Sequence, residues 1–202
     1  MIDVVMQEKI KSKIKEVEAK SSCELVAMIT YKSDEYTFIP VMYAALLSLL
    51  YPLFHFFFFS DENAAHIYNM QMLVFVVTLL IVHNPYIKYL LIPQSVKHKR
   101  ASHNAHKQFI IQGLNQTSNH QAVLFFVSVK EKYVEIIVDR GISEKVDNAF
   151  FEKVVHHFTQ KVKKGEFAEG YLEAIEMCSK KLIETFPSTE PHDVLPNELI
   201  IV

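Results

Sequence analysis

The sequence predicts a three-layer α/β/α sandwich with a small mixed sheet, interrupted by a two-helix transmembrane hairpin. Two observations lead to this prediction. Residues Phe38–Phe59 contain no Asp, Glu, Lys or Arg, and a second apolar run follows almost at once. The segments on either side of these runs have helix and strand patterns, with one strand before the runs and two after them.

Residues 1–34 are predicted to form one helix and one strand. Apolar residues at helical spacing predict an amphipathic helix, namely Met6, Ile10, Ile14 and Val17. A pair of serines ends this helix, and Cys23–Tyr31 has the pattern of a strand. Because a lone helix and strand cannot bury a core, this strand is expected to pair with Ala122–Val129 or with Tyr133–Asp139.

The run Phe38–Phe59 is long and apolar enough to cross a membrane. A helix of this length rises about 33 Å, and the hydrocarbon core of a bilayer is about 30 Å thick. Its aliphatic and phenylalanine side chains favour insertion by about 4–8 kcal/mol, against modest penalties from Pro40, Pro52 and His55. The alternative is a buried core helix, which rarely is apolar on every face.

The second span is predicted from Ile67 to Tyr86, so that the hairpin occupies residues 38–92. Ile67–Val82 is uncharged, and Pro85 is expected to kink or end the helix. This run is shorter and more polar than the first. An interfacial or re-entrant segment is therefore the alternative.

Charge predicts the orientation of the hairpin. The loop of residues 60–66 has no Lys or Arg, whereas Lys20 and Lys32 precede the hairpin and five basic residues follow it, namely Lys88, Lys97, Lys99, Arg100 and Lys107. The positive-inside rule then predicts a multi-pass protein of the cell inner membrane with both termini and the soluble domain in the cytoplasm. The charged N-terminal segment offers no signal peptide.

Residues 95–186 are predicted to supply the rest of the domain, and residues 187–202 an extended tail. A helix is predicted over Ala101–Gln116, with an apolar side formed by Phe109, Ile110 and Leu114. Ala122–Val129 is almost wholly apolar, as is typical of a strand buried on both faces. Tyr133–Asp139 follows after a short charged turn, which predicts an antiparallel hairpin.

Two further helices are expected to complete this flank. Gly141 is interpreted as a flexible joint and Ser143 as the N-cap of a helix over Glu144–Lys163, which Gly165 ends. The inward residues of that helix are Val146, Phe150, Val154 and Phe158. A last helix, Phe167–Glu184, is expected to bury Tyr171, Ile175, Cys178 and Leu182.

Composition excludes several classes of function. The net charge of −2 gives no bias toward nucleic acid, and the basic cluster Val96–Arg100 is interpreted as a topology signal that touches anionic headgroups. Cys23 and Cys178 lie far apart without metal-ligand spacing, which predicts two inert thiols in a reducing compartment. The sequence contains no phosphate-binding glycine loop.

The segment His120–Ile142, HQAVLFFVSVKEKYVEIIVDRGI, resembles the core of the TPM domain, the family of thylakoid-lumen acid-phosphatase-like and related bacterial membrane proteins. Lys164–Phe167 and Gly170–Ile175 are similar to the family's glycine, aromatic, glycine and apolar helix start. The resemblance covers about Ala101–Phe186 and implies an α/β/α sandwich. It implies no single activity, since phosphatase activity, photosystem repair and receptor modulation have all been attached to the family.

Asp139, Arg140 and Asp147 are the candidate ligand-binding residues, because they lie where a strand ends and a helix begins. The carboxylates are suited to Ca²⁺ or another divalent cation, and the guanidinium to a phosphate. The alternative is structural: Asp139 and Arg140 cap the strand and pair on the surface, and Asp147 favours a helix N-terminus. No nucleophile motif is present, so the catalytic residues stay unknown.

Ten histidines raise the question of a transition metal. His103 and His106 share a predicted helix with His98, but no cysteine or acidic residue lies in that segment, so no metal site is predicted there. His55 and His83 lie in or at the ends of the predicted spans. Helix–helix hydrogen bonding is a simpler role for them than a conduction path.

The sequence therefore predicts a membrane-anchored TPM-like domain that acts as a binding or assembly module. Its predicted partners are the lipid bilayer and another membrane protein, with no nucleic acid. The alternative is a weak metal-assisted acid phosphatase that uses Asp139 and Asp147. A subunit of a small-ligand transporter is a third hypothesis, which requires oligomerisation to form a pore.

Overall fold

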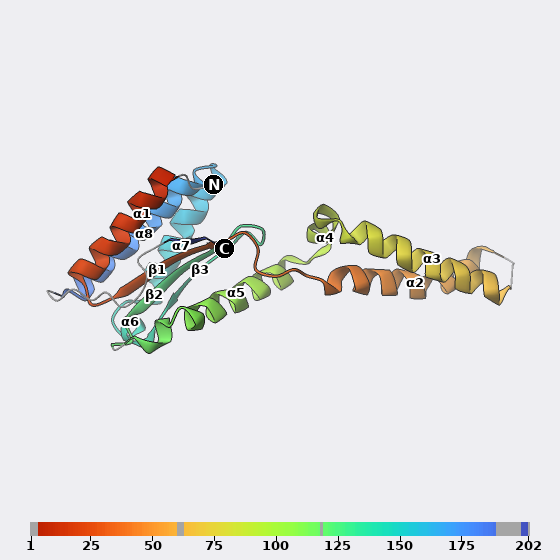
Figure 1. Ribbon diagram of the computed structural model, residues 1–202, viewed down its shortest axis with the longest axis horizontal. Coiled ribbons are helices and arrows are strands. Elements are labelled where there is room, and N and C mark those ends of the chain that lie inside the picture. The colour runs from red at the N-terminus through yellow and green to blue at the C-terminus, as the bar shows by residue number, and fades with distance from the viewer. Residues whose placement is uncertain (1–3, 60–62, 118, 189–198, 202) are drawn as a thin grey trace. The chain divides into compact units, whose positions relative to one another are not determined.

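A computed structural model describes residues 4–59, 63–117, 119–188 and 199–201 of the chain (Figure 1). The chain divides into two compact units. The first unit combines residues 1–33 with residues 98–202, and the second unit is residues 34–97. The first unit is therefore assembled from both sides of the apolar segment.

The first unit is built on a mixed sheet whose described strands lie in the order β3-β2-β1-β4. β1 (Glu24–Thr30) pairs in parallel with β2 (Ala122–Ser128), and β2 pairs antiparallel with β3 (Tyr133–Val138). The prediction that the N-terminal strand joins a strand of the C-terminal flank is confirmed, and so is the antiparallel hairpin. The short strand β4 (Ile200–Ile201) also pairs with β1, which the sequence did not predict for the tail.

The burial of the strands follows from their order in the sheet. Every residue of β1 and of β2 is buried, because each strand has a neighbour on both sides and helices over both faces. Every residue of β3 is partly buried, since β3 lies at an edge of the described sheet. The almost continuous apolar sequence of β2 reflects this double burial.

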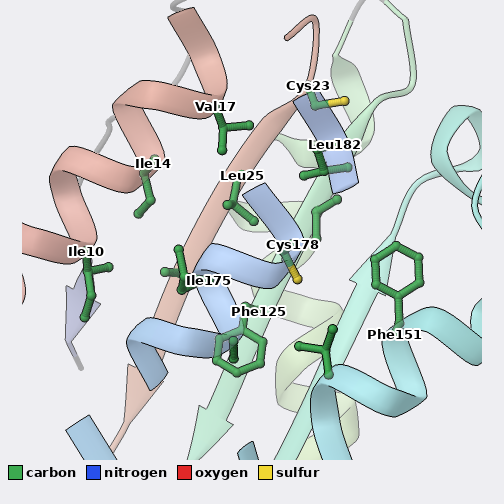
Figure 2. Close-up of a cluster of buried hydrophobic side chains, with 14 of the residues drawn as sticks. Ile10, Ile14, Val17, Cys23, Leu25, Phe125, Phe151, Ile175, Cys178 and Leu182 are labelled. Carbon is green, nitrogen blue, oxygen red and sulfur yellow. The ribbon is translucent and has the colours of Figure 1, made fainter. Parts of the chain in front are cut away.

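Three helices cover one face of the sheet: α1 (Val4–Lys20), α7 (Asn148–Lys163) and α8 (Phe167–Thr185). Figure 2 shows how their side chains meet those of the central strands. The contributors include Ile10, Ile14 and Val17 from α1, Ile175, Cys178 and Leu182 from α8, Phe151 from α7, and Leu25 and Phe125 from the strands. The predicted inward faces of α1 and α8 are confirmed.

The other face is covered by α5 (Gln94–Ile111) and a short 3₁₀ turn, Leu114–Gln116. Ala105, Phe109 and Leu114 pack there against β1 and β2, so the first unit has three layers, as predicted. The prediction that Ile110 points inward is wrong, because Ile110 is 61% exposed. Ala101, Ala105 and Phe109 are buried and lie four positions apart, on the face of α5 that packs against the sheet. Ile110 is the next residue, so its side chain points away from that face.

Gly141 is not a flexible joint, in contrast to the prediction. It lies inside the single-turn helix α6 (Arg140–Ser143). A Cβ atom at this position would lie 2.6 Å from the carbonyl oxygen of Asn119 and 2.7 Å from that of His120. A glycine is needed here because another part of the backbone passes so close.

The predicted start of the long helix at Glu144 is also wrong. α7 begins at Asn148, and Asp147 is its N-cap, accepting a hydrogen bond from the Ala149 backbone N–H at 3.0 Å. Ser143 instead ends α6 and donates its hydroxyl hydrogen bond to the carbonyl of Arg140 at 2.9 Å. Asp139 is the N-cap of α6 and Asp147 is the N-cap of α7, so the segment forms two helices where one was predicted.

The second unit contains α2 (Phe38–Phe58), α3 (Ala64–His83) and α4 (Pro85–Leu91), and α2 packs against α3. α3 begins three residues earlier and ends three residues earlier than the predicted second span. Its end is set by Asn84, whose side chain accepts a hydrogen bond from the Tyr86 N–H at 3.0 Å and caps α4.

Replacing Gly141 with alanine is expected to lower the free energy of unfolding by about 1–3 kcal/mol, because the new methyl group must displace backbone atoms. Thermal unfolding of the purified protein, followed by circular dichroism, measures the change. Ser143→Ala in the same turn is the control, with a loss of about 1 kcal/mol or less. A Gly141→Ala protein as stable as the wild type would contradict the close approach.

Candidate functional site

Asp139 directly follows β3 and is the N-cap of α6. Its Oδ1 accepts a hydrogen bond from the Arg140 backbone N–H at 2.7 Å, and its Oδ2 lies 3.1 Å from Nδ1 of His120. The Asp139 side chain is 16% exposed. This corner of the sheet therefore combines a carboxylate, an imidazole and, at the next position, a guanidinium.

The other two predicted residues have separate local partners. The Arg140 side chain is 83% exposed, and its Nε donates to Oε1 of Glu144 at 2.8 Å. Asp147 caps α7 through the Ala149 N–H. The two aspartates thus cap two successive helices. Asp147 lies at a helix N-terminus, as in the structural alternative, whereas Asp139 caps α6 and Arg140 pairs with Glu144 instead of Asp139. The role of the three residues in binding a ligand stays a prediction.

The histidines of α5 have ordinary local contacts. Nδ1 of His106 lies 2.9 Å from the carbonyl oxygen of Ser102, and the ring of His98 lies 5.3 Å from that of Tyr133. His103 is exposed. Among the described residues, no group of three or more His, Cys, Asp or Glu side chains is arranged to hold a metal ion.

A buried polar cluster lies at the carboxyl ends of β1 and β2. Glu131, in the turn between β2 and β3, is fully buried, and its Oε2 accepts a hydrogen bond from Oγ of Ser128 at 2.5 Å. The same oxygen accepts from the Ser33 backbone N–H at 3.2 Å, and the hydroxyls of Ser33 and Ser128 lie 2.8 Å apart. The cluster ties the segment after β1 to the turn after β2.

The sequence did not single out this cluster. The sequence predicts a charged turn at Lys130-Glu131-Lys132, and the structure has a turn there, but the side chain of Glu131 is buried. A possible signal was Ser128, a hydroxyl in an otherwise apolar strand that needs a partner when it is buried.

Both cysteines are buried in the core of the first unit, where Figure 2 shows them. Burial raises the pKa of the Cys23 thiol to about 12, and it does the same for Cys178. Because the thiolate is the nucleophile and the metal ligand, both side chains stay protonated and unreactive at neutral pH. This agrees with the expectation of two inert thiols.

Comparison with known proteins supports the family resemblance. The family model described as the TPM domain matches residues 89–181. A solved structure, the NMR structure of the BA42 protein from the psychrophilic bacterium Bizionia argentinensis, is similar with a TM-score of 0.62 at 17% sequence identity. That likeness covers 100% of this chain and 96% of the other and concerns the fold alone. No protein of curated function matches the chain.

The first unit is thus an α/β protein with a mixed sheet between two helical layers. Residues 89–181 match the TPM domain family, and the solved structure shares the fold of the chain. The matched segment begins after β1, so α1 and β1 are parts of the sandwich that precede it in the sequence.

Replacing Glu131 with alanine is expected to lower the free energy of unfolding by about 1–3 kcal/mol, because the Ser33 N–H and the Ser128 hydroxyl lose their acceptor. Glu131→Gln is the matched control, because it keeps an acceptor oxygen, and a smaller loss is expected. Thermal unfolding of both variants measures the difference. Equal stability of Glu131→Ala and the wild type would show that the cluster is not a structural tie.

Proposed function

We propose that this protein is a membrane-anchored TPM domain that acts as a binding or assembly module at a membrane. The observation that carries the proposal is the surface of the second unit. α2 and α3 are 21 and 20 residues long, and both are apolar enough to cross a membrane. A core helix of a soluble protein with this composition would be mostly buried, but these two are not.

The exposed side chains of α2 and α3 support a lipid environment. The residues of α2 that are buried occupy one stripe toward α3, namely Ile39, Pro40, Ala44, Ser48 and His55. The remaining surface of the pair is formed by large apolar side chains, which include Leu46, Leu49, Leu53, Leu73, Val76 and Leu80. Apolar patches of this kind are rare on soluble monomers and are typical of surfaces that meet lipid or protein.

The polar groups of α2 support a paired-helix anchor. Ser48 and His55 are buried, and Nδ1 of His55 lies 3.5 Å from the hydroxyl of Tyr51. The His55 ring stacks on Phe59 and lies 5.9 Å from the ring of His66. Polar residues in membrane-spanning helices usually face a neighbouring helix, and here they face the hairpin interior.

The proposed orientation places both termini in the cytoplasm. Its support is the excess of Lys and Arg in the flanks and their absence from the loop of residues 60–66. Both flanks must in any case lie on one side of the membrane, because β1 and β2 belong to one sheet.

The membrane proposal predicts that the protein resists extraction from membranes at alkaline pH. Leu49→Lys together with Leu73→Lys puts a charge on the exposed face of each helix at a cost of about 2.5–3.5 kcal/mol each. We expect alkaline extraction to release a larger fraction of this variant than of the matched Leu49→Ala, Leu73→Ala variant. Release of the wild-type protein would contradict membrane anchoring.

The same cells test the orientation. A reporter active only in the cytoplasm is expected to be active when fused after Val202 and inactive when inserted between α2 and α3, within residues 61–63. An inactive reporter after Val202 would reverse the proposed topology without affecting the anchoring result.

A metal-assisted acid phosphatase is the second candidate. One observation favours it: Asp139 lies against His120 and precedes the exposed Arg140, which places a carboxylate, a proton carrier and a phosphate-binding group at one corner. Against it, Asp139 and Asp147 are each engaged as helix caps.

We therefore expect the full chain to hydrolyse p-nitrophenyl phosphate no faster, with Ca²⁺ or Mg²⁺ present, than its Asp139→Asn variant does. Release of p-nitrophenol at acidic and neutral pH measures the rate. The thermal stability of both proteins is compared with and without metal, because a bound cation raises the melting temperature. Metal-dependent turnover that Asp139→Asn abolishes would replace the binding proposal with the phosphatase.

A further inference from the structure

β3 is an edge strand. Within the described residues it pairs with β2 on one side and with no strand on the other. All six of its residues are partly exposed. The unpaired backbone groups of an edge strand form a template for another extended chain.

A groove runs beside this edge, between β3 and α7. It consists of two adjoining hollows of about 590 Å³ and about 470 Å³, and both are lined by Val134 and Thr159. We call it the β3–α7 groove. Val134 and Ile136 of β3 form its floor, and Val155, Thr159 and Val162 of α7 line its wall. The residues of α7 recur three or four positions apart, so one face of the helix forms the wall.

The wall of the β3–α7 groove is firmly held, and it is apolar between its polar residues Asn148, Glu152 and His156, which line the smaller hollow. The hydroxyl of Thr159 donates to the carbonyl of Val155 at 2.8 Å, which satisfies it within the helix. Phe158 lines the larger hollow and packs edge-to-face on Phe125 and Tyr171 of the core. An incoming apolar side chain therefore meets a surface that is fixed by the core behind it.

The two ends of the β3–α7 groove carry opposite charges. Lys132 and Lys163 line the larger hollow, where β3 begins and α7 ends. Glu152 lines the smaller hollow near the start of α7 and accepts a hydrogen bond from the Asn148 amide at 2.9 Å. The carboxylate of Glu135 lies on the other face of β3, where the Ser102 hydroxyl of α5 donates to it. A chain that lies antiparallel to β3 has its C-terminal end at the lysines and its N-terminal end toward Glu152.

We propose that the β3–α7 groove binds an extended peptide that adds an antiparallel strand to β3. The peptide has apolar side chains at alternate positions, an acidic group toward its C-terminal end and a basic group toward its N-terminal end. The backbone of β3 supplies affinity, and the apolar floor and the end charges select the partner. This inference rests on the proposed binding role and gives that role a partner of defined chemistry.

The length of β3 sets the size of the partner. Six residues in extended conformation span about 20 Å, so a hexapeptide covers the strand. The probe is the fluorescein-labelled hexapeptide Lys-Thr-Val-Thr-Val-Glu with a free carboxylate. Its matched partner, Glu-Thr-Val-Thr-Val-Lys with an amidated end, has the same apolar positions and reversed charges.

Fluorescence polarisation of the detergent-solubilised full chain measures binding of both peptides. We expect the first peptide to bind at least about tenfold tighter than the second, a difference of about 1.4 kcal/mol. Thr159→Trp fills the middle of the groove and is expected to weaken the first peptide by about tenfold or more. The Lys132→Glu, Lys163→Glu variant is expected to prefer the second peptide.

The control is Lys9→Glu, Lys15→Glu, which makes the same charge change at exposed positions of α1 and is expected to leave both affinities unchanged. If Thr159→Trp does not fold, the proposal is tested by the peptide preference of the Lys132→Glu, Lys163→Glu variant alone. The proposal is overturned if neither peptide binds at about 1 mM, or if the lysine variant keeps the wild-type preference. Membrane extraction of the same protein separates such a failure from a failure of the anchoring proposal.

Discussion

The parallel pairing of β1 with β2 is the contact on which the rest of the structure depends. The register runs from Glu24 opposite Ala122 to Thr30 opposite Ser128, and both strands are buried throughout. The two strands lie on opposite sides of the apolar hairpin in the sequence. Because the entropy of closing a loop grows slowly with its length, the insertion of a hairpin between them is compatible with a stable sheet.

This pairing also decides which surfaces remain available. With β1 and β2 in the centre, the core of α1, α7 and α8 forms on one face and that of α5 on the other. The β-hairpin formed by β2 and β3 then places β3 at an edge of the sheet, beside α7. The buried Glu131 holds the segment after β1 against the turn that starts β3. The start of the edge strand is thus tied to the segment that follows β1.

The elements that could be predicted from sequence are those set by local patterns. The apolar strand β2 and the faces of α1 and α8 follow from periodicity, and α2 follows from the length of an uncharged run. The features that escaped prediction depend on contacts distant in sequence. Gly141 lies against the backbone carbonyls of Asn119 and His120, and Glu131 accepts a hydrogen bond from the backbone N–H of Ser33. The sequence identified the candidate residues but not their role, because an aspartate such as Asp139 or Asp147 suits a helix cap and a cation equally well.

Native-state amide hydrogen exchange of the full chain tests the shared sheet most directly. If β1 and β2 form one cooperative core, the amides of Leu25–Ile29 and Val123–Val127 exchange at the same slow rate, by opening of the whole domain. Exchange of the β1 amides orders of magnitude faster than that of the β2 amides would show that residues 1–33 are not an integral part of the domain.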